Sequence, residues 1–423
     1  MIKPLPRLLS AALVCGLIVA IQSGASGNEP SSLWSQWRGP NRTGHIAPNH
    51  PWPSSIEEST LQEAWRVELG PSYSSPIVAD EHVFVTETVD KKYEVVRALN
   101  RKTGEQAWEL RWEGAMKVPF FAQSNGSWIR ATPVYDSGRL YVAGIRDVLS
   151  CIDASNGKEI WRVDFVKDHG GKVPDFGFVS SPLIDGDYLY VQAGGGCSKL
   201  EKATGNIVWT SLKDGGGMMG SAFSSPVKAE IHGVSQLVVQ TRTKLCGVSL
   251  EDGKQLWSQD VPAFRGMNIL TPTVIGDRIF TSSYGGESFL YKINHQAADW
   301  TVEEVWTNRK QGYMSSPVVI DNHIYMHLRN QRFTCINLDT GEDTWTTESF
   351  GKYWSLITNG KQILALDERG DLLLIKANPK QFELVESRDI ADAETWAHLG
   401  ISDRELFVRE LNAMVVYRWN DGP

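Results

Sequence analysis

Aromatic and polar side chains recur along this 423-residue chain, each close to a Ser/Thr-Pro step or to the segment that stands in its place. Aromatic rings offer faces for stacking, and Arg, Asn and His offer hydrogen bonds, so such residues around a concave surface could hold a small ligand. The alternative is that the rings only pack between neighbouring structural units. The candidate ligand-binding residues are Tyr73, Trp128, Arg130, His169, Phe178, Phe223, Asn268, Tyr313, Trp354 and Trp396.

Motifs of catalysis and metal binding are missing from the sequence. It has no HExxH, no Cys/His pair at metal spacing, no GxSxG and no GxxxxGK[ST]. Asp168, His169 and Asp175 share one loop, but such a group is more often solvated than metal-bound. We therefore predict no catalytic residue and no metal site.

An internal repeat must position the candidate residues. Five segments place a Gly four residues before a Trp, and Ser/Thr-Pro steps recur about every 45 residues. Two degenerate copies follow, beginning at Trp354 and Trp396. The repeat residues are Gly104 and Trp108, Gly157 and Trp161, Gly205 and Trp209, Gly253 and Trp257, and Gly341 and Trp345.

Each copy reads as four short strands separated by Gly- and Asp-containing turns, which is the pattern of a propeller blade. The repeated Gly falls in the turn before the outer strand, where a tight hairpin needs positive φ. The Trp follows on the outer strand, where it can pack against the neighbouring blade. We predict an all-β fold: a single eight-bladed β-propeller of four-stranded antiparallel blades.

The two ends of the repeat predict how the propeller closes. Residues 61–69 resemble an outer strand without its three partners, and residues 395–419 resemble three strands without an outer one. Joined, they complete a blade and remove an open sheet edge.

The N-terminal residues 1–60 do not belong to the repeat. Residues 1–27 have the charged, apolar and small-residue regions of a secretory signal peptide. Cys15 is either a lipidation site or an apolar residue of that signal. Residues 28–60 are predicted to form an extended arm that Trp34, Trp37 and Trp52 pin to the propeller, which spans residues 61–423.

The charge and composition of the chain limit the classes of binding partner and the cellular compartment that we expect. A net charge of −8 and a pI near 5.7 argue against nucleic acid. We expect an exported monomer with no transmembrane span after removal of the signal. Cys151 and Cys335 are expected to be small buried strand residues. A disulfide between Cys197 and a cysteine of an adjacent blade, such as Cys246, stays open.

The repeated segments, such as CIDASNGKEIW and CINLDTGEDTW, resemble the tryptophan-docking repeat of pyrroloquinoline quinone (PQQ)-like β-propellers. That family contains quinoprotein alcohol dehydrogenases and the non-catalytic BamB lipoprotein of outer-membrane β-barrel assembly. The opening WSQWRGPNRTG is similar to exported planctomycete propellers described as PQQ-like or BamB-like. The repeat builds blades and does not itself bind the quinone.

The resemblance implies two functions. The favoured one is a non-catalytic scaffold or binding module at the cell envelope, periplasmic or outer-membrane associated, with a protein partner and no cofactor. The alternative is a dehydrogenase using PQQ with calcium, or another small-ligand or sugar-binding enzyme, in the axial funnel. The quinoprotein Cys-Cys dipeptide is missing, which disfavours the enzyme.

One loop carries a second feature of the resemblance. The segment DVPAFRGMN is similar to the surface loop through which BamB engages its partner, so Arg265 matches the interface arginine. The alternative for Arg265 is an ordinary solvated charge. The paired aspartates that accompany this arginine in BamB are not found.

Overall fold

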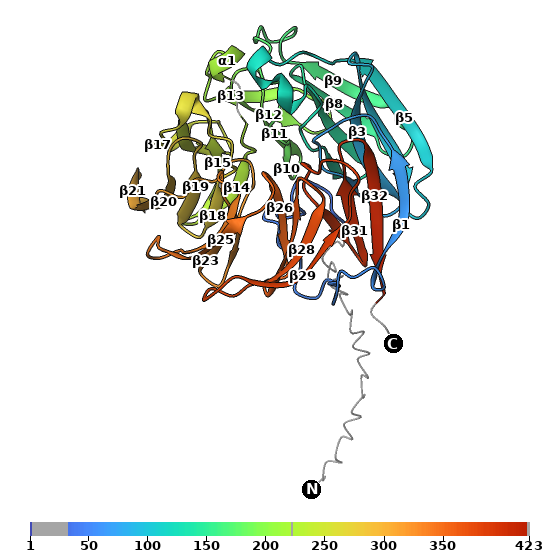
Figure 1. Ribbon diagram of the computed structural model, residues 1–423. Coiled ribbons are helices and arrows are strands. Elements are labelled where there is room, and N and C mark those ends of the chain that lie inside the picture. The colour runs from blue at the N-terminus through green and yellow to red at the C-terminus, as the bar shows by residue number, and fades with distance from the viewer. Residues whose placement is uncertain (2–32, 221–222, 421–423) are drawn as a thin grey trace. The chain divides into compact units, whose positions relative to one another are not determined.

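The structure is a computed structural model that describes Met1, residues 33–220 and residues 223–420. Eight separate four-stranded antiparallel sheets follow one another around a common axis (Figure 1). The predicted eight-bladed, all-β propeller is confirmed. Apart from Met1, the predicted signal at 1–27 lies outside the described residues.

The first four blades are consecutive in sequence. Blade 1 contains β2 (Ile77–Val78), β3 (His82–Val89), β4 (Tyr93–Asn100) and β5 (Gln106–Glu113). Blade 2 contains β6 (Val134–Asp136), β7 (Arg139–Gly144), β8 (Val148–Asp153) and β9 (Glu159–Asp164). Blade 3 contains β10 (Leu183–Asp185), β11 (Tyr188–Gln192), β12 (Cys197–Glu201) and β13 (Ile207–Ser211). Blade 4 contains β14 (Val227–Ile231), β15 (Val234–Gln240), β16 (Lys244–Ser249) and β17 (Gln255–Asp260).

The remaining blades follow the same order, except that the last one borrows a strand. Blade 5 contains β18 (Thr273–Ile275), β19 (Arg278–Ser282), β20 (Ser288–Gln296) and β21 (Asp299–Asn308). Blade 6 contains β22 (Val318–Ile320), β23 (His323–His327), β24 (Arg332–Asn337) and β25 (Asp343–Ser349). Blade 7 contains β26 (Trp354–Thr358), β27 (Gln362–Asp367), β28 (Asp371–Lys376) and β29 (Glu383–Asp389). Blade 8 contains β30 (Gly400–Ser402), β31 (Glu405–Arg409), β32 (Ala413–Trp419) and β1 (Leu61–Glu68).

Short helical turns occur only in loops that join one blade to the next, within the described residues. These turns are η1 (Phe120–Asn125), α1 (Gly217–Gly220) and η2 (Phe264–Gly266). No helix in the described part of the chain is long and apolar enough to cross a bilayer. The face that carries these loops is therefore built from irregular backbone on a rigid set of sheets.

Strand β1 closes the propeller by pairing with β32 (Figure 1). The register runs from Leu61 opposite Trp419 to Glu68 opposite Ala413. This confirms the closure predicted from residues 61–69, with the strand ending one residue earlier. Both ends of the repeat thus share one blade, and β32 has a partner on both sides and is not an edge strand.

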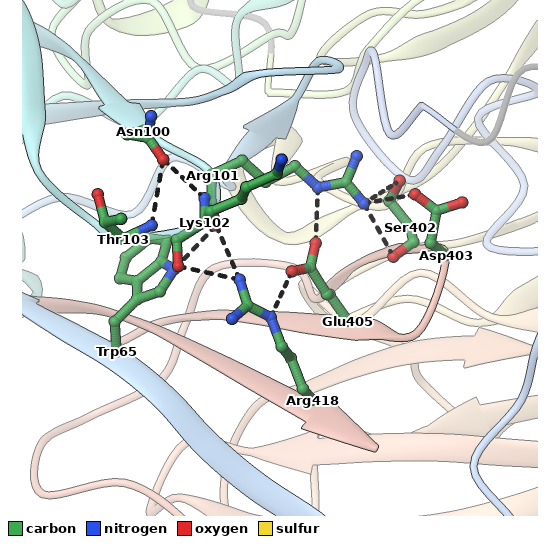
Figure 2. Close-up of polar contacts among 9 residues, drawn as sticks. All are labelled: Trp65, Asn100, Arg101, Lys102, Thr103, Ser402, Asp403, Glu405 and Arg418. Carbon is green, nitrogen blue, oxygen red and sulfur yellow. Dashed lines mark hydrogen bonds and ion pairs between the residues drawn. The ribbon is translucent and has the colours of Figure 1, made fainter. Parts of the chain in front are cut away.

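A polar network joins this closing blade to blade 1, and Figure 2 shows it. The Arg101 guanidinium donates to Glu405 at 2.6 Å and to Asp403 at 2.7 Å. Arg418 donates to the other Glu405 oxygen at 2.7 Å, and Trp65 Nε1 donates to the Arg101 carbonyl at 2.9 Å. Because Glu405 lies between two guanidinium groups, the charges at this interface are largely compensated.

The repeat Trp of one blade docks on the repeat Gly of the next. Gly157 has φ of 75°, and a Cβ added there would lie 2.6 Å from the Trp108 ring. The Trp108 indole also donates to the Ala154 carbonyl at 2.9 Å. The expected positive φ and the packing between blades are both confirmed. The same indole-to-carbonyl bond is made by Trp65, Trp161, Trp209, Trp306 and Trp345.

Trp257 packs in the cluster that blades 4 and 5 share, as predicted for a repeat Trp, but its indole bonds within its own blade. Its indole donates to Gln236 of its own blade at 2.6 Å, and its ring lies over Gly247. Blade 5 has no Thr-Gly turn to receive it, because the β20–β21 hairpin turns at Ala297 instead. Trp306 takes the docking role for blade 5, although no Gly precedes it by four residues.

The Ser/Thr residues of the Ser/Thr-Pro steps link neighbouring blades around the axis. Backbone N–H groups of one blade donate to the hydroxyl of the next, at 3.1 Å for Ser75 to Thr132 and 3.0 Å for Thr132 to Ser181. Equivalent bonds to side-chain hydroxyls run from Ser181 to Ser225, from Ser225 to Thr271 and from His398 to Ser75. Two further bonds run to the preceding blade instead, from Trp354 to Ser315 and from Leu399 to Ser355. The step is therefore a blade-to-blade connection, and Pro has no N–H to compete with it.

The segment 33–46 crosses the axis from blade to blade. The Trp34 carbonyl accepts from Val78 in blade 1, and the Ile46 N–H donates to Thr358 in blade 7. Arg42 donates to Pro182 O in blade 3 at 2.7 Å, and Arg38 donates to Pro317 O in blade 6 at 2.6 Å. These carbonyls belong to Ser-Pro steps on different sides of the axis, so the segment closes the channel at this level. Trp34 and Trp37 are buried, and Trp52 packs against the core of blades 7, 8 and 1.

Burial is concentrated between blades. Each large apolar cluster joins residues of adjacent blades, as in the cluster around Tyr141, Phe165 and Leu189 of blades 2 and 3. Cys151, Cys197, Cys246 and Cys335 are all buried and free. Burial raises the pKa of the Cys197 thiol to about 12, so it is an apolar packing group in this state.

Candidate functional site

A cavity of about 150 Å³ lies on the axis beside the segment that closes the channel. Trp37 forms one part of its wall, and residues at the beginnings of the blades form the rest. The lining consists of Trp37, Tyr73, Arg130, Thr132, Val179, Ser181, Phe223, Ser225, Ile269, Thr271, Met314, Ser315, Ser316, Tyr353, Trp354, Trp396 and His398. We call this space the axial cavity.

Half of the ligand residues predicted from the sequence line this cavity. They are Tyr73, Arg130, Phe223, Trp354 and Trp396. Each lies in the loop before a blade's first strand or in its first residue. The shared position in the repeat brings them together across long sequence distances.

The other predicted residues lie elsewhere. Phe178 is fully buried in the core between blades 2 and 3. The Asn268 amide is buried and donates to the Val261 and Arg242 carbonyls. His169 is exposed beside the Phe165 ring, at 6.1 Å between centroids. The first two hold loops in place, and none of the three lines the cavity.

Trp128 and Tyr313 lie next to the cavity without lining it. Burial raises the pKa of Tyr73 to about 12 although a hydrogen bond to Trp128 opposes this shift. The Tyr313 ring lies 4.8 Å from Tyr284 and 5.8 Å from Tyr353. Trp128 and Tyr313 therefore contact Tyr73 and Tyr353, which line the cavity.

Several aromatic rings of the cavity lining contact other rings. Tyr73 stacks on Trp396 at 4.6 Å, and Trp396 contacts Tyr353 at 4.3 Å. Elsewhere in the same set of interblade loops Phe223 contacts Phe176 at 5.5 Å. Sequence reasoning missed Tyr353 and Phe176, although each lies within two residues of a chosen aromatic. Adjacent or alternate residues of a loop point in different directions, which a one-position pattern does not resolve.

The cavity region is rich in cations. Arg38 and Arg42 are only 3% and 5% exposed, and their guanidinium groups lie 5.6 and 5.4 Å from the Trp37 ring. Burial lowers the pKa of both to about 9, and it also lowers the pKa of Arg130. Burial, with the field of Arg38, lowers the pKa of His398 to about 3, so this imidazole is neutral.

Carboxylates stay outside the lining. No described residue that lines the axial cavity is Asp or Glu. Glu394 lies near Tyr73 and raises its pKa, and Glu368 accepts from the Tyr353 N–H at 3.3 Å. Burial raises the pKa of Glu368, which further reduces its tendency to carry charge. The cavity itself therefore has positive charge without an acidic counterpart.

A calcium-bound quinone does not fit this lining. Calcium takes six to eight oxygen ligands, usually including carboxylates, and the described lining supplies no carboxylate. Among the described residues, no group of three His, Cys, Asp or Glu side chains could hold a metal ion. The hydroxyl oxygens nearby already accept backbone N–H groups of neighbouring blades.

Arg265 lies on the same set of interblade loops but outside the axial cavity. It is exposed at the tip of η2 with φ of 52°, and its guanidinium lies 5.1 Å from the Phe264 ring. Its carbonyl accepts from the Arg242 guanidinium at 2.6 Å. A positive φ is unusual for arginine, so the Arg242 contact fixes an otherwise disfavoured tip.

Comparison with known proteins identifies the family. The model of a family described as "Outer membrane protein assembly factor BamB" matches residues 54–125 and 92–347. The chain belongs to this family. The resemblance to PQQ-like, BamB-like propellers is thereby confirmed.

Individual BamB proteins are distant relatives. The BamB of Shewanella oneidensis is 25% identical over 284 residues, which span 66% of this chain and 64% of that protein. The BamB of Yersinia pestis is 22% identical over 351 residues, or 80% of this chain and 81% of that protein. The chain thus matches a little under two thirds of the first relative and most of the second.

Two solved structures of different function share the fold of this chain. The crystal structure of BamB from Moraxella catarrhalis has a TM-score of 0.62 at 13% identity, covering 86% of this chain and 99% of that one. A europium-containing methanol dehydrogenase has a TM-score of 0.51 at 11% identity, covering 91% and 98%. Fold similarity at these identities does not choose between binding and catalysis.

Proposed function

We propose that this BamB-family propeller is an exported, non-catalytic binding module that engages a protein of the cell envelope through its interblade loops. The observation that carries the proposal is a set of exposed aromatic side chains beside an exposed arginine on these loops. Phe120, Phe121 and Phe264 are 83%, 52% and 51% exposed. We call Phe120, Phe121, Phe176, Phe264 and Arg265 the docking patch.

Contacts link the loops that carry the docking patch. Phe121 contacts Phe120 at 5.6 Å and Phe176 at 6.1 Å. The Arg242 guanidinium lies 5.9 Å from the Phe176 ring and donates to the Arg265 carbonyl. Arg242 therefore bridges the loop before blade 3 and the loop before blade 5.

The composition of the patch suits a protein partner. Aromatic residues and arginine are enriched at protein interfaces and supply most of the strong single-residue contributions. Large exposed apolar side chains gathered on one surface are uncommon without a partner to cover them. The exposed apolar residues of the outer strands, such as Leu384 and Val385, lie on β29 instead.

Family membership supports an envelope partner. The relatives are named as factors of outer-membrane protein assembly. Export and periplasmic or outer-membrane association are part of the proposal, and they rest on the predicted signal at residues 1–27. A monomeric state is part of the proposal as well. The match to Arg265 remains a resemblance that the experiment below tests.

The test is capture from envelope extract with the wild-type chain and a Phe264→Ala/Arg265→Ala double variant. Leu384→Ala/Val385→Ala, which removes exposed apolar groups from β29, is the matched control. We expect an envelope protein to be retained by the wild type and the control, and to be reduced about tenfold or more with the double variant, as for loss of an interface hot spot. Equal capture by all three chains, or no specific capture, would refute the proposal.

A further inference from the structure

A second cavity lies between blades 1 and 2 and shares no lining residue with the axial cavity. Its volume is about 320 Å³, which can hold on the order of ten water molecules. The lining comes from β4 and β5 of blade 1, from β8 and β9 of blade 2, and from the loops that follow β5, β7 and β9. No residue of the docking patch lines it. We call this space the interblade cavity.

Three cationic side chains line the interblade cavity: Arg146, Arg162 and Lys167. Arg146 and Lys167 are exposed, and neither side chain has a hydrogen bond or an ion pair to another described residue. Arg162 is paired with Glu159 at 2.5 Å, and its guanidinium lies 4.9 Å from the Trp112 ring. Contacts thus hold Arg162 at the wall of the cavity, while Arg146 and Lys167 keep all their donors for a ligand.

Two carboxylates of the lining are engaged elsewhere. Glu113 forms an ion pair with Lys92 at 2.7 Å. Asp164 Oδ1 accepts the backbone N–H groups of Val166 and Lys167, at 3.1 and 2.9 Å. Neither carboxylate forms an ion pair with a described cation of the lining, so these cations can attract an anion from solvent.

The third carboxyl of the lining belongs to Glu94, which is buried at the inner wall. It accepts the Ile145 N–H at 2.7 Å and Trp112 Nε1 at 2.8 Å. Burial raises its pKa to about 7, although the fields of Arg162 and Arg146 oppose this shift. An anion beside these arginines would be repelled by ionised Glu94 but not by neutral Glu94. Anion binding and proton uptake by Glu94 therefore favour each other.

The oxygens of the ligand must satisfy three cations. A carboxylate has only two oxygens, whereas the phosphate of a monoester has three that can accept, and the forked guanidinium suits phosphate well. The volume leaves room beside the phosphate for a small polar group. We propose that the interblade cavity binds the phosphate group of a small phosphate ester through Arg146, Arg162 and Lys167. A soluble ester and a phospholipid headgroup share this chemistry.

Calorimetry with a soluble ester and sedimentation with lipid vesicles, both on the full chain, test the proposal. The soluble probe is glycerol 3-phosphate, with glycerol as its neutral counterpart. The lipid probe is vesicles of phosphatidylglycerol, with phosphatidylcholine vesicles as the counterpart of no net charge. We expect at least one anionic probe to bind about tenfold or more tightly than its counterpart, as for a hydrogen bond to a charged group. The probe that binds identifies the source as soluble or lipid. Binding of neither anionic probe, or equal binding of each anionic probe and its counterpart, would overturn the proposal.

Variants locate the phosphate. Arg146→Gln and Lys167→Gln should each weaken binding by about tenfold or more. Lys172→Gln is the matched control, because Lys172 is an exposed lysine of the same loop as Lys167 and does not line the cavity. Unchanged affinity in both cavity variants, or an equal loss in the control, would refute the assignment. The Phe264→Ala/Arg265→Ala variant should keep wild-type affinity for the phosphate probe, which separates failure of this inference from failure of the docking patch.

The pH dependence gives a result that a general attraction between charges would not give. A phosphate ester gains charge near pH 6, so the wild type and Glu94→Gln are compared at the same pH. Near pH 8 Glu94→Gln should bind about threefold or more tightly than the wild type, and near pH 6 the two should bind alike because Glu94 is then mostly neutral. Asp147, whose pKa burial also raises to about 7, does not line the cavity and is present in both proteins. Equal affinities near pH 8 would refute the position of the phosphate beside Glu94.

Discussion

Substituting Gly157 by Ala tests the docking of one blade on the next. Gly157 has φ of 75°, and its added Cβ would lie 2.6 Å from Trp108 Cε3 and 2.8 Å from Cδ2. A left-handed conformation costs a non-Gly residue about 1–2 kcal/mol. Overpacking against a ring held by its bond to Ala154 adds about 1–3 kcal/mol. We therefore expect Gly157→Ala to lower the free energy of unfolding by about 2–5 kcal/mol.

Gly138 of the same blade provides the matched control. Its φ is 79°, and an added Cβ there would meet nothing within 4 Å. Gly138→Ala should cost only the backbone contribution of about 1–2 kcal/mol. Urea unfolding followed by tryptophan fluorescence gives both values, with calorimetry to check that unfolding is two-state. Equal losses for the two variants would refute the claim that the Gly157 position is a platform for Trp108.

Two further predictions concern burial. The Glu94 carboxyl accepts from the Ile145 N–H and Trp112 Nε1, yet burial raises its pKa to about 7. Because the folded-state pKa is above the unfolded one, its stabilising contribution is present below about pH 4.5 and is lost as pH rises through 7. A pKa shift of this size corresponds to a loss of about 3 kcal/mol of stability by pH 8. The unfolding free energy of the wild type should therefore fall more steeply from pH 5 to 8 than that of Glu94→Gln. Parallel pH profiles of the two proteins would contradict this prediction. Trp37→Ala, in the segment across the axis, should lower the unfolding free energy by about 3–5 kcal/mol. The control Val208→Ala, on the exposed side of β13, should change it by about 0.5 kcal/mol or less. Similar urea midpoints for the two variants would contradict the closure of the axis by this segment.

The sequence predicted the blades because their determinants are local. A Thr-Gly turn needs positive φ, and the Trp four residues later falls on the outer strand, so Gly157 and Trp161 mark a hairpin without knowledge of its neighbours. The relation between blades was harder to predict, since Gly157 receives Trp108 of the preceding copy. For the same reason the sequence did not show that Trp257, which packs between blades 4 and 5 as predicted, would bond to Gln236 of its own blade and not to a turn of blade 5.

The candidate site was only half predictable because direction within a loop depends on tertiary contacts. Phe178 and Phe176 are two residues apart, but Phe178 lies in the core and Phe176 contacts Phe223 at the surface. The cation-rich wall had no sequence signal either. Arg38 and Arg42 come from a segment without strands, and their place on the axis depends on bonds to Pro317 and Pro182.

Polar groups of the repeat and of the interblade loops have different roles in this propeller. The repeat supplies bonds between blades: Trp108 Nε1 donates to the Ala154 carbonyl, and the Thr132 hydroxyl accepts the Ser75 N–H. Because such bonds recur around the axis, they join neighbouring blades in a similar way while the sequences of the interblade loops differ. Those loops and the segment across the axis build the axial cavity, and the loops also carry the docking patch.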